Sequence, residues 1–366
     1  MKRFVFISQG LNNAEASGIQ RNTLELLKCL DGIVSSKEAD LLIPVWETDN
    51  YTFQNINVVK CGKQYNKFGK LGKKIANYLY KNYYTWRYIK QKNSLSIDLL
   101  LMVPLYGCDI EMIYDCIPEL FPSHYNTKIR KRARKKRLRH QKRALHRARL
   151  VLTDSESAKR DIIRFYKIDE GIIKVIPCGW QHFIKIEEDG AILKKLGLLP
   201  NQYFFSLGSR LPHKNAKWLS YAAKTNPHYK FVVSGSSPKN QVYDFEGESL
   251  PNMIFAGRLS DGEVKTLMRY CKAFIQPSLY EGFGSPPMEA MSVGADCIVS
   301  NVASLPEVYK KSVWYIDPYD YDKIDLNEIM SRPKESNKII LEEYSWEKSA
   351  KKLYAILKQL ANEKSG

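Results

Sequence analysis

Residues 277–290 read PSLYEGFGSPPMEA, and they follow an apolar run of strand length, Ala273–Gln276. A segment with the apolar spacing of a helix extends from Pro287 to Val293. Gly282 and Gly284 lie in the loop between them, where the absence of a Cβ lets a ligand approach the backbone closely. The stretch therefore predicts a buried strand, a ligand-binding loop and a helix, the repeating unit of parallel α/β proteins.

The same stretch places two carboxylates eight residues apart, Glu281 in the loop and Glu289 on the helix. Unpaired N–H groups at the start of a helix attract an anion or a sugar hydroxyl, and Glu289 can accept two hydrogen bonds from the hydroxyls of a ribose. The alternative is that both residues have structural roles, so that Glu281 caps the helix and Glu289 interacts with the helix dipole. The surrounding glycines and prolines favour the ligand-binding interpretation.

Strands and helices alternate in both directions from this stretch, in two series separated by a junction at Pro177–Pro200. The first series opens with a strand at Arg3–Ser8 and a helix at Gly18–Leu30. Its further strands are expected at Leu41–Val45, around Val58, and at Leu99–Val103, Met112–Tyr114, Leu150–Thr153 and Ile173–Ile176. Strands of the second series are expected at Tyr203–Leu207, Phe231–Ser234, Met253–Phe255, Ala273–Gln276, Asp296–Val299 and Val313–Ile316.

The two series predict an α/β fold of two Rossmann-like domains, residues 1–178 and 179–345, that face each other across a cleft. The C-terminal helical segment, within residues 346–366, is expected to pack back on the first domain. Ligands of such sheets bind outside the carboxyl ends of the strands, so the chemistry is expected in the strand-to-helix loops.

The composition excludes several classes of protein. With 366 residues, 44% of them hydrophobic and 12% aromatic, the chain can build two packed interiors, which excludes a wholly disordered protein. Its seven cysteines include no C-x-x-C pair, so neither a disulfide framework nor a thiolate zinc site is indicated, and a reducing cytosol is expected. The apolar run Phe4–Ile7 is too short for a secretory signal, and Leu99–Leu105 falls short of the ~20 residues of a membrane span.

The formal net charge of +18 is concentrated in the first half of the chain. Residues 1–180 contain 33 Lys and Arg against 17 Asp and Glu, whereas residues 181–366 contain 24 against 22. A field of this polarity attracts anions to one half of the protein, whether they are phospholipid headgroups, nucleic acid or a pyrophosphate-linked substrate.

Two stretches without any acidic residue carry much of this charge. Lys60–Ile97 holds ten Lys and Arg among aromatic side chains, and Lys128–Arg149 holds 13, including Lys131, Arg134 and Lys135. Such side chains suit a headgroup interface, where each cation contributes ~1 kcal/mol on an anionic membrane. We therefore expect peripheral attachment to an anionic membrane surface. A nucleic-acid interface and a solvated charged face are the alternatives, and no nucleic-acid fold signature accompanies the two stretches.

Motifs along nearly the whole chain resemble those of the family 4 retaining glycosyltransferases, which have the GT-B fold. Glu281 and Glu289 look like the E-x7-E element of that family, which is the most specific match. The other matching segments are Ile113–Pro122 (IYDCIPELFP), Thr153–Asp161 (TDSESAKRD), Gly208–Asn215 (GSRLPHKN), Ser304–Val308 (SLPEV) and Tyr344–Glu347 (YSWE).

The resemblance implies that Arg210 and Lys214 hold the diphosphate of a nucleotide diphosphate sugar. Paired cations stabilise the negative charge that develops on a leaving diphosphate, so no metal ion is required. The sequence has no DxD-like motif in a plausible loop, and its six His lack ligand spacing, so no metal and no cofactor are expected. The alternative is that Arg210 and Lys214 bind no ligand and lie at the solvated start of a helix. Gly18 would bring backbone N–H groups near the distal phosphate.

The resemblance assigns the other donor contacts to the E-x7-E loop. Glu281 would contact the hydroxyls of the transferred sugar, and the backbone of Phe283 and Gly284, together with Ser285, would assist it. Glu289 would bind the ribose.

Tyr114 departs from the family pattern, since family members often carry His directly before the position of Asp115. A phenol with a pKa of about 10 does not shuttle protons near neutral pH as an imidazole does. Tyr114 can still donate a hydrogen bond, while Asp115 either positions the acceptor or stabilises its loop. In retaining members of the family, the leaving phosphate takes the proton of the acceptor.

The predicted function is a retaining, metal-independent glycosyltransferase, a hexosyl- or deoxyhexosyltransferase of cell-envelope or capsular polysaccharide assembly. Its first domain would bind a lipid-linked saccharide acceptor, and its second domain would bind the nucleotide sugar. The expected location is the cytoplasm, at the inner face of the membrane. The alternatives are a non-catalytic homologue that binds nucleotide sugars and a basic nucleic-acid-binding protein.

Overall fold

Two parallel β-sheets organise the chain in the computed structural model, which describes residues 2–11, 18–48, 50–64, 69–102, 104–208, 211–235 and 250–363. Unit 1 comprises Met1–Cys178 and Trp346–Gly366, and unit 2 comprises Gly179–Ser345. The sequence analysis drew its domain boundaries at the same residues. Each unit is described by itself below.

The sheet of unit 1 has seven strands in the order β3-β2-β1-β4-β5-β6-β7, and its neighbouring strands pair in parallel. Parallel strands of this kind are buried on both faces, and β1, β2 and β6 are buried along their whole length. The strands are β1 (Phe4–Ile7), β2 (Ala39–Pro44), β3 (Asn57–Cys61), β4 (Leu95–Asp98), β5 (Ile110–Met112), β6 (Leu150–Thr153) and β7 (Ile173–Val175).

Helices form most of the connections between these parallel strands. A single π-helical turn, η2 (Tyr80–Tyr84), joins α2 to α3 without a break. The other helical segments are α1 (Gly18–Asp31), α2 (Gly69–Leu79), α3 (Thr85–Lys92), α4 (Ile117–Leu120), η3 (Pro122–His124), α5 (Lys128–Arg147), α6 (Glu156–Tyr166) and η4 (Glu170–Ile172).

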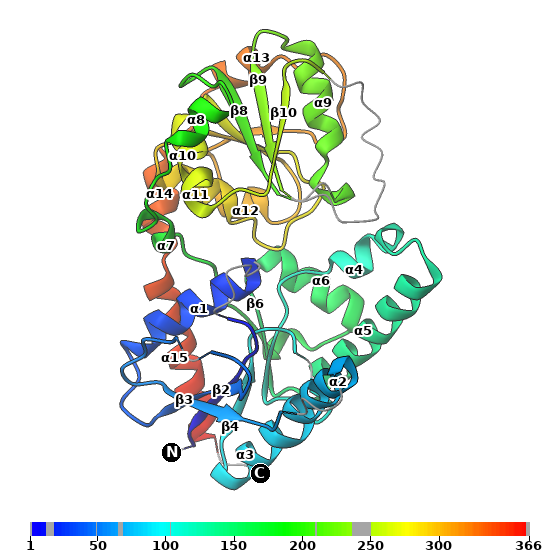
Figure 1. Cartoon of the computed structure of the whole chain (residues 1–366), viewed down its shortest axis with the longest axis vertical. Coiled ribbons are helices and arrows are strands. Elements are labelled where there is room, and N and C mark those ends of the chain that lie inside the picture. The colour runs from blue at the N-terminus through cyan, green and yellow to red at the C-terminus, as the bar shows by residue number, and fades with distance from the viewer. Residues whose placement is uncertain are drawn as a thin grey trace. The chain divides into compact units, whose positions relative to one another are not determined.

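The C-terminal helix α15 (Trp346–Asn362) completes unit 1 and lies beside α1 (Figure 1). Its buried side chains recur at helical spacing and include Leu353 and Leu357, both fully buried. The Nζ of Lys358 donates a hydrogen bond of 3.2 Å to the carboxylate of Glu38, and the ring of Tyr354 packs edge-on against Phe4. Apolar packing and an ion pair thus hold the end of the chain on unit 1.

The sheet of unit 2 has six parallel strands in the order β10-β9-β8-β11-β12-β13. They are β8 (Tyr203–Leu207), β9 (Lys230–Ser234), β10 (Met253–Gly257), β11 (Ala273–Gln276), β12 (Cys297–Ser300) and β13 (Trp314–Ile316). The helical segments are α7 (Gln181–Ile184), α8 (Ala191–Lys195), η5 (Pro212–Lys214), α9 (Ala216–Thr225), α10 (Asp261–Tyr270), α11 (Pro286–Ser292), α12 (Leu305–Tyr309), α13 (Leu326–Ser331) and α14 (Asn337–Glu343).

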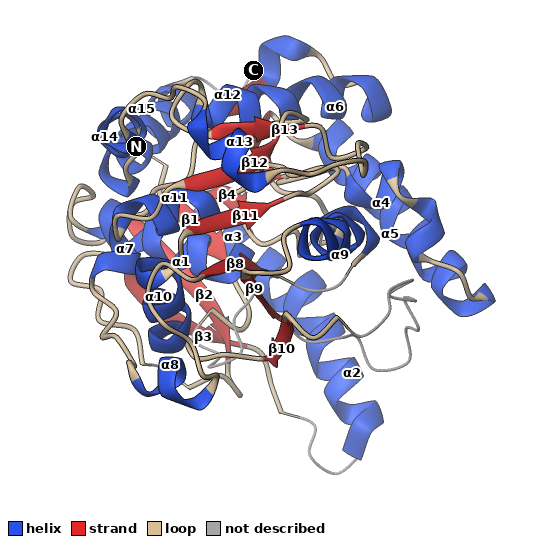
Figure 2. Ribbon diagram, turned by 90° about the horizontal axis from the view of Figure 1, so that it is seen from above, coloured by secondary structure: helices blue, strands red, loops and turns tan. Residues whose placement is uncertain are grey.

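The core of unit 2 follows the alternation of side chains along a strand. Phe204 on β8 packs with Phe231 and with Trp218 of α9, whereas the next residue, Phe205, packs against Phe274 of β11. Successive side chains of a strand point to opposite faces, so both faces of the sheet need a helical cover. Figure 2 shows α9 on one side of these strands and α10 and α11 on the other.

One predicted strand is wrong. The sequence analysis expected it at the apolar run Leu99–Val103, but the strand is β4 (Leu95–Asp98), and its polar residues Ser96 and Asp98 are buried. Ser96 is satisfied by Asp109, whose carboxylate accepts bonds of 2.9 Å from the Ser96 amide and 2.6 Å from its hydroxyl. Partners distant in sequence therefore make a polar segment a central strand.

Within the described part of the chain, no helix combines the length and the apolar character that crossing a membrane would need.

Candidate active site

Glu281 lies at the centre of a polar cluster at the carboxyl end of β11 in unit 2. Its Oε1 accepts hydrogen bonds of 2.7 Å from Lys214 Nζ, 2.8 Å from Gln276 Nε2 and 2.6 Å from Ser278 Oγ. Lys214 Nζ also lies 3.0 Å from Oε2. Two residues of the predicted site, Glu281 and Lys214, are therefore in direct contact.

The environment of Glu281 keeps its carboxylate charged. Burial opposes the charged form, but the positive charge of Lys214 and the hydrogen bonds from Lys214 and Ser278 outweigh burial and hold the pKa of Glu281 below its usual value. The Glu281 side chain is only 9% exposed, whereas that of Lys214 is 26% exposed. The lysine thus reaches solvent from a position next to a fixed negative charge.

Asn215 positions Lys214, and the sequence analysis did not single it out. Its backbone is left-handed (φ 54°) between η5 and α9, a conformation that Asn tolerates better than most residues. Its side-chain amide donates hydrogen bonds of 3.0 Å to Pro277 O and 2.7 Å to Pro318 O. Asn215 therefore ties the turn that carries Lys214 to the loop that carries Glu281. The available signal was an Asn immediately before a helix.

The loop after Glu281 is held in place by side chains that donate hydrogen bonds to its backbone carbonyls. Ser304 Oγ donates to the carbonyls of Glu281 and Phe283, at 3.0 and 3.1 Å, and Tyr309 OH donates to Gly284 O at 2.5 Å. Gly284 adopts φ +83°, and a Cβ at this position would lie 2.6 Å from Leu305 Cδ2. Only glycine fits both constraints without a shift of its surroundings.

Glu289 lies on α11, buried, and it contacts a residue that the sequence analysis missed. His182 of α7 lies with its Nε2 3.2 Å from Glu289 Oε1. Ser285 precedes α11, and its carbonyl accepts from the amides of Met288 and Glu289. Phe283 packs edge-on against Tyr344, with 5.5 Å between ring centroids. Phe283 and Ser285 thus make contacts that stabilise the loop and the start of α11.

A small cavity adjoins Lys214 at the carboxyl ends of β8, β9 and β11. Its lining includes Gly208, Lys214, Gln276 and Ser278, and its volume is about 10 Å³. That volume corresponds to about one water molecule, so the cavity is only the inner end of any site for a larger ligand. Arg210, the partner predicted for Lys214, lies outside the described residues.

The other predicted residues belong to unit 1. Gly18 is the first residue of α1, and no atom of the residues that the structure describes lies within 4 Å of where its Cβ would stand. Tyr114 is buried, and its hydroxyl donates to Leu99 O at 2.8 Å and lies 3.1 Å from Thr23 Oγ1. Burial raises the pKa of Tyr114 far above its usual value. Asp115 accepts a bond of 2.9 Å from the amide of Ile117 at the start of α4, as expected of a loop-stabilising residue.

The three cations assigned to the acceptor or lipid side lie on α5 and differ from one another. Lys131 and Lys135 are exposed. Arg134 is half-buried, and its Nε donates to Pro118 O at 2.5 Å while its guanidinium lies over the ring of Tyr125. Arg134 thus fastens α5 to α4, which contains Pro118.

The chain matches one family model and several known proteins over part of its length. Residues 191–346 match the family described as Glycosyl transferases group 1. The chain is 29% identical over 201 residues to the serotype-specific mannosyltransferase WbdA of Escherichia coli, covering 51% of this chain and 24% of that protein. It is 28% identical over 243 residues to the O-antigen chain mannosyltransferase B of Escherichia coli, covering 58% of this chain and 62% of that protein. The chain thus spans less than two thirds of the length of either relative.

The fold has a close counterpart among solved structures. The sucrose-phosphate synthase of Thermosynechococcus elongatus is similar over 98% of this chain and 99% of that chain, with a TM-score of 0.71 and 15% sequence identity. At this identity the likeness shows the fold alone. The predicted fold class of two Rossmann-like α/β domains and the resemblance to GT-B glycosyltransferases are confirmed, whereas membership of family 4 stays a prediction.

Proposed function

We propose that this chain, which has the GT-B fold, is a retaining glycosyltransferase that moves a sugar, with mannose the first candidate, from a nucleotide diphosphate sugar to a saccharide acceptor of a cell-surface polysaccharide. Mannose is chosen because both relatives named above are mannosyltransferases. Unit 2 binds the donor, since it contains Glu281, Glu289 and Lys214.

The contact between Lys214 and Glu281 carries the proposal. An ammonium group has three N–H donors, and the two bonds to Glu281 leave one for a phosphate oxygen. Cleavage of the glycosyl phosphate bond leaves negative charge on the diphosphate, which a cation already fixed in position stabilises. Lys214 thereby supplies the charge that a metal ion supplies in other transferases, which supports a metal-independent reaction.

Glu281 and Glu289 have separate roles in this proposal. The ionised, buried Glu281 accepts hydrogen bonds from hydroxyls of the transferred sugar and, through Lys214, remains a fixed negative charge near the anomeric carbon. Glu289 accepts the hydroxyls of the ribose, and His182 orients its carboxylate through the contact at Oε1. His182 is a positioning residue in this account.

The proton of the acceptor hydroxyl goes to the leaving group. The acceptor oxygen forms its bond to the anomeric carbon on the face from which the diphosphate departs, and a diphosphate oxygen takes the proton, so that configuration is retained. Tyr114 does not serve as the base, because its hydroxyl is buried, already hydrogen-bonded and of raised pKa.

An exposed apolar stripe on unit 1 supports attachment to a membrane. Leu71, Ile75 and Tyr78 are 61%, 38% and 57% exposed on α2 and recur at the spacing of one helix face, and Trp86 of α3 is 41% exposed. Lysines accompany them, and α2 has no acidic residue. This is the composition of helices that lie in a headgroup interface. The membrane brings a lipid-linked acceptor to the enzyme in this proposal.

A transfer assay tests the proposed function. Purified protein is incubated with radiolabelled UDP-, GDP- and dTDP-sugars and bacterial membrane extract, and incorporation into lipid-linked material is measured. We expect incorporation from one donor, its loss in Lys214→Ala, and its retention in Lys224→Ala, an exposed lysine of α9. Binding of a nucleotide sugar without turnover would favour the non-catalytic homologue. Tight, salt-sensitive binding of nucleic acid, with no affinity for anionic vesicles, would favour the nucleic-acid-binding protein.

A further inference from the structure

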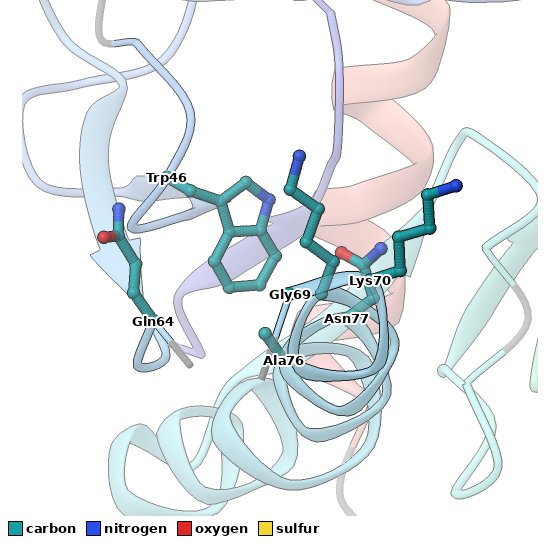
Figure 3. A pocket seen from close by; sticks show the side chains of 7 residues that line it. Trp46, Gln64, Gly69, Lys70, Ala76 and Asn77 are labelled. Carbon is teal, nitrogen blue, oxygen red and sulfur yellow. The ribbon is translucent and has the colours of Figure 1, made fainter. Parts of the chain in front are cut away.

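A pocket of about 590 Å³ opens in unit 1, and its described lining includes none of the residues that the sequence analysis assigned to the acceptor. Trp46, two residues after β2, and Gln64, three residues after β3, line one side of it, and Gly69, Lys70 and Asn77 of α2 line the other (Figure 3). The volume lies within the ~300–1,000 Å³ of small-molecule sites. The pocket also lies at the carboxyl ends of parallel strands, where α/β sheets bind ligands.

The indole of Trp46 packs against a buried tyrosine, Tyr80, at one wall of the pocket. It packs edge-on against the ring of Tyr80, with 5.9 Å between centroids. The hydroxyl of Tyr80 is itself anchored, since it donates to Ser8 O at 2.6 Å and Leu42 O at 2.7 Å. Gly62 lies beside both rings, since a Cβ there would be in van der Waals contact with Trp46 at 3.7 Å and with Tyr80 at 3.8 Å. A fixed aromatic face in a pocket suits stacking against the apolar face of a sugar ring.

Two cations border the same pocket without an acidic partner. Lys70 and Lys73 stand three residues apart on α2, so they share one face of the helix. Among the residues that the structure describes, neither forms an ion pair. The carboxylate nearest in sequence to Trp46, Glu47, is occupied by the Gly10 amide at 2.8 Å and the Tyr51 hydroxyl at 2.7 Å. Two ammonium groups beside one aromatic wall suit a ligand with phosphate and sugar parts.

We propose that this pocket binds a phosphorylated saccharide, with the sugar ring on Trp46 and the phosphate oxygens on Lys70 and Lys73. If the proposed function holds, this ligand is the acceptor, since the donor is assigned to unit 2. The opposite face of α2 carries the exposed residues Leu71, Ile75 and Tyr78, so one helix would contact both the membrane and the phosphosugar of a lipid-linked acceptor.

Binding is measured directly by calorimetry, without any donor, so that the result does not depend on turnover. The probes are free mannose 1-phosphate and a dodecyl diphosphate-linked monosaccharide in neutral detergent micelles. We expect K70A and K73A each to weaken binding by about tenfold, the low end of the effect of losing a charge-assisted hydrogen bond. K74A is the matched control, since Lys74 belongs to the same helix but does not line the pocket, and it should bind as wild type.

Substitutions of Trp46 test the role of the aromatic wall. W46F keeps a ring at the wall and should retain most of the affinity, whereas W46A should lose it, and circular dichroism checks that W46A is folded. Preference for the micellar probe would identify a lipid-linked ligand, and equal affinity for mannose 1-phosphate would identify a soluble sugar phosphate; both support the site.

The proposal is overturned if neither probe binds or if K74A weakens binding as much as K70A. It is also overturned if W46A and W46F both bind as wild type. Failure of the transferase assay with intact probe binding would remove the proposed function and leave this site. Transfer to membrane acceptors by a K70A/K73A double variant at the wild-type rate would leave the proposed function and show that the ligand of this pocket is not the acceptor.

Discussion

Replacing Lys214 by Met removes the cation from Glu281 while keeping the aliphatic stem that packs against Gly208. Removal of one partner from a buried ion pair costs about 3–5 kcal/mol of unfolding free energy. Glu281 retains its bonds from Gln276 and Ser278, and Lys214 is 26% exposed, so water replaces part of the lost interaction. We expect Lys214→Met to lower the free energy of unfolding of unit 2 by ~2 kcal/mol at pH 7.

The dependence of this loss on pH follows from the pKa of Glu281. In the wild type that pKa is lowered, so the stabilisation is present above the ordinary value of 4.5 and is lost only as the pH falls through the lower folded value. In Lys214→Met, the hydrogen bond from Ser278 remains but the positive charge of Lys214 is lost, so burial raises the pKa of Glu281 relative to the wild type, and protonation stabilises the variant as the pH falls. The difference in stability between the two proteins is therefore largest near pH 7 and shrinks toward pH 5.

Urea denaturation, followed by tryptophan fluorescence and circular dichroism at pH 7 and pH 5, measures the difference. Glu281→Gln and the double variant complete a thermodynamic cycle, whose coupling energy we expect to be about 1–2 kcal/mol at pH 7. A coupling energy indistinguishable from zero, or a loss that is the same at both pH values, would refute the argument that Lys214 neutralises a buried carboxylate.

Three further predictions concern stability. Gly284→Ala should destabilise unit 2 by about 1–3 kcal/mol, because its Cβ would lie 2.6 Å from Leu305 Cδ2 and its φ is +83°. Thermal denaturation measures this loss, and an unchanged melting temperature would show that the alanine is not strained. Leu353→Ala, in the buried face of α15, should cost ~2–5 kcal/mol in urea denaturation, with exposed Lys352→Ala as a neutral control; equal effects would show that α15 is not packed as described. Burial raises the pKa of Glu119 to about 7, so its ionisation opposes folding above that pH, and Glu119→Gln should stabilise the protein more at pH 8 than at pH 5, by ~1–2 kcal/mol in the same assay. A gain that did not depend on pH would show that the carboxyl is not neutral in the fold.

Most of the fold could be predicted from the sequence because parallel strands are buried on both faces and therefore appear as short apolar runs. Tyr203–Leu207, Ala273–Gln276 and Leu150–Thr153 have the predicted bounds. Apolar runs do not predict β4, because this strand contains the buried polar residues Ser96 and Asp98. The partner of Ser96 is Asp109, 13 positions away, and a local pattern of hydrophobicity contains no information about such a partner.

The candidate site, like the fold, could be predicted only in part from the sequence. Glu281 and Lys214 could be selected from their motifs, and they are in contact. The contact of His182 with Glu289 joins residues 107 positions apart, so only the tertiary fold reveals it. The pocket at Trp46 was missed for a different reason. Its lysines lie in a stretch interpreted as a membrane face, and the sequence alone could not separate the two faces of one helix.

The charge distribution gives the two units different means of binding anions. In unit 2 the cation of the site, Lys214, is already paired with Glu281, so it acts on a diphosphate at hydrogen-bond distance and adds little to the positive field farther away. In unit 1 the basic residues of α2 and α5 face no acidic residue within their own helices. Attraction between exposed charges is screened over about 10 Å at 0.1 M salt, whereas short hydrogen bonds in a buried site are not. Affinity for the donor should thus depend on geometry, and affinity for an anionic acceptor or membrane should depend on ionic strength.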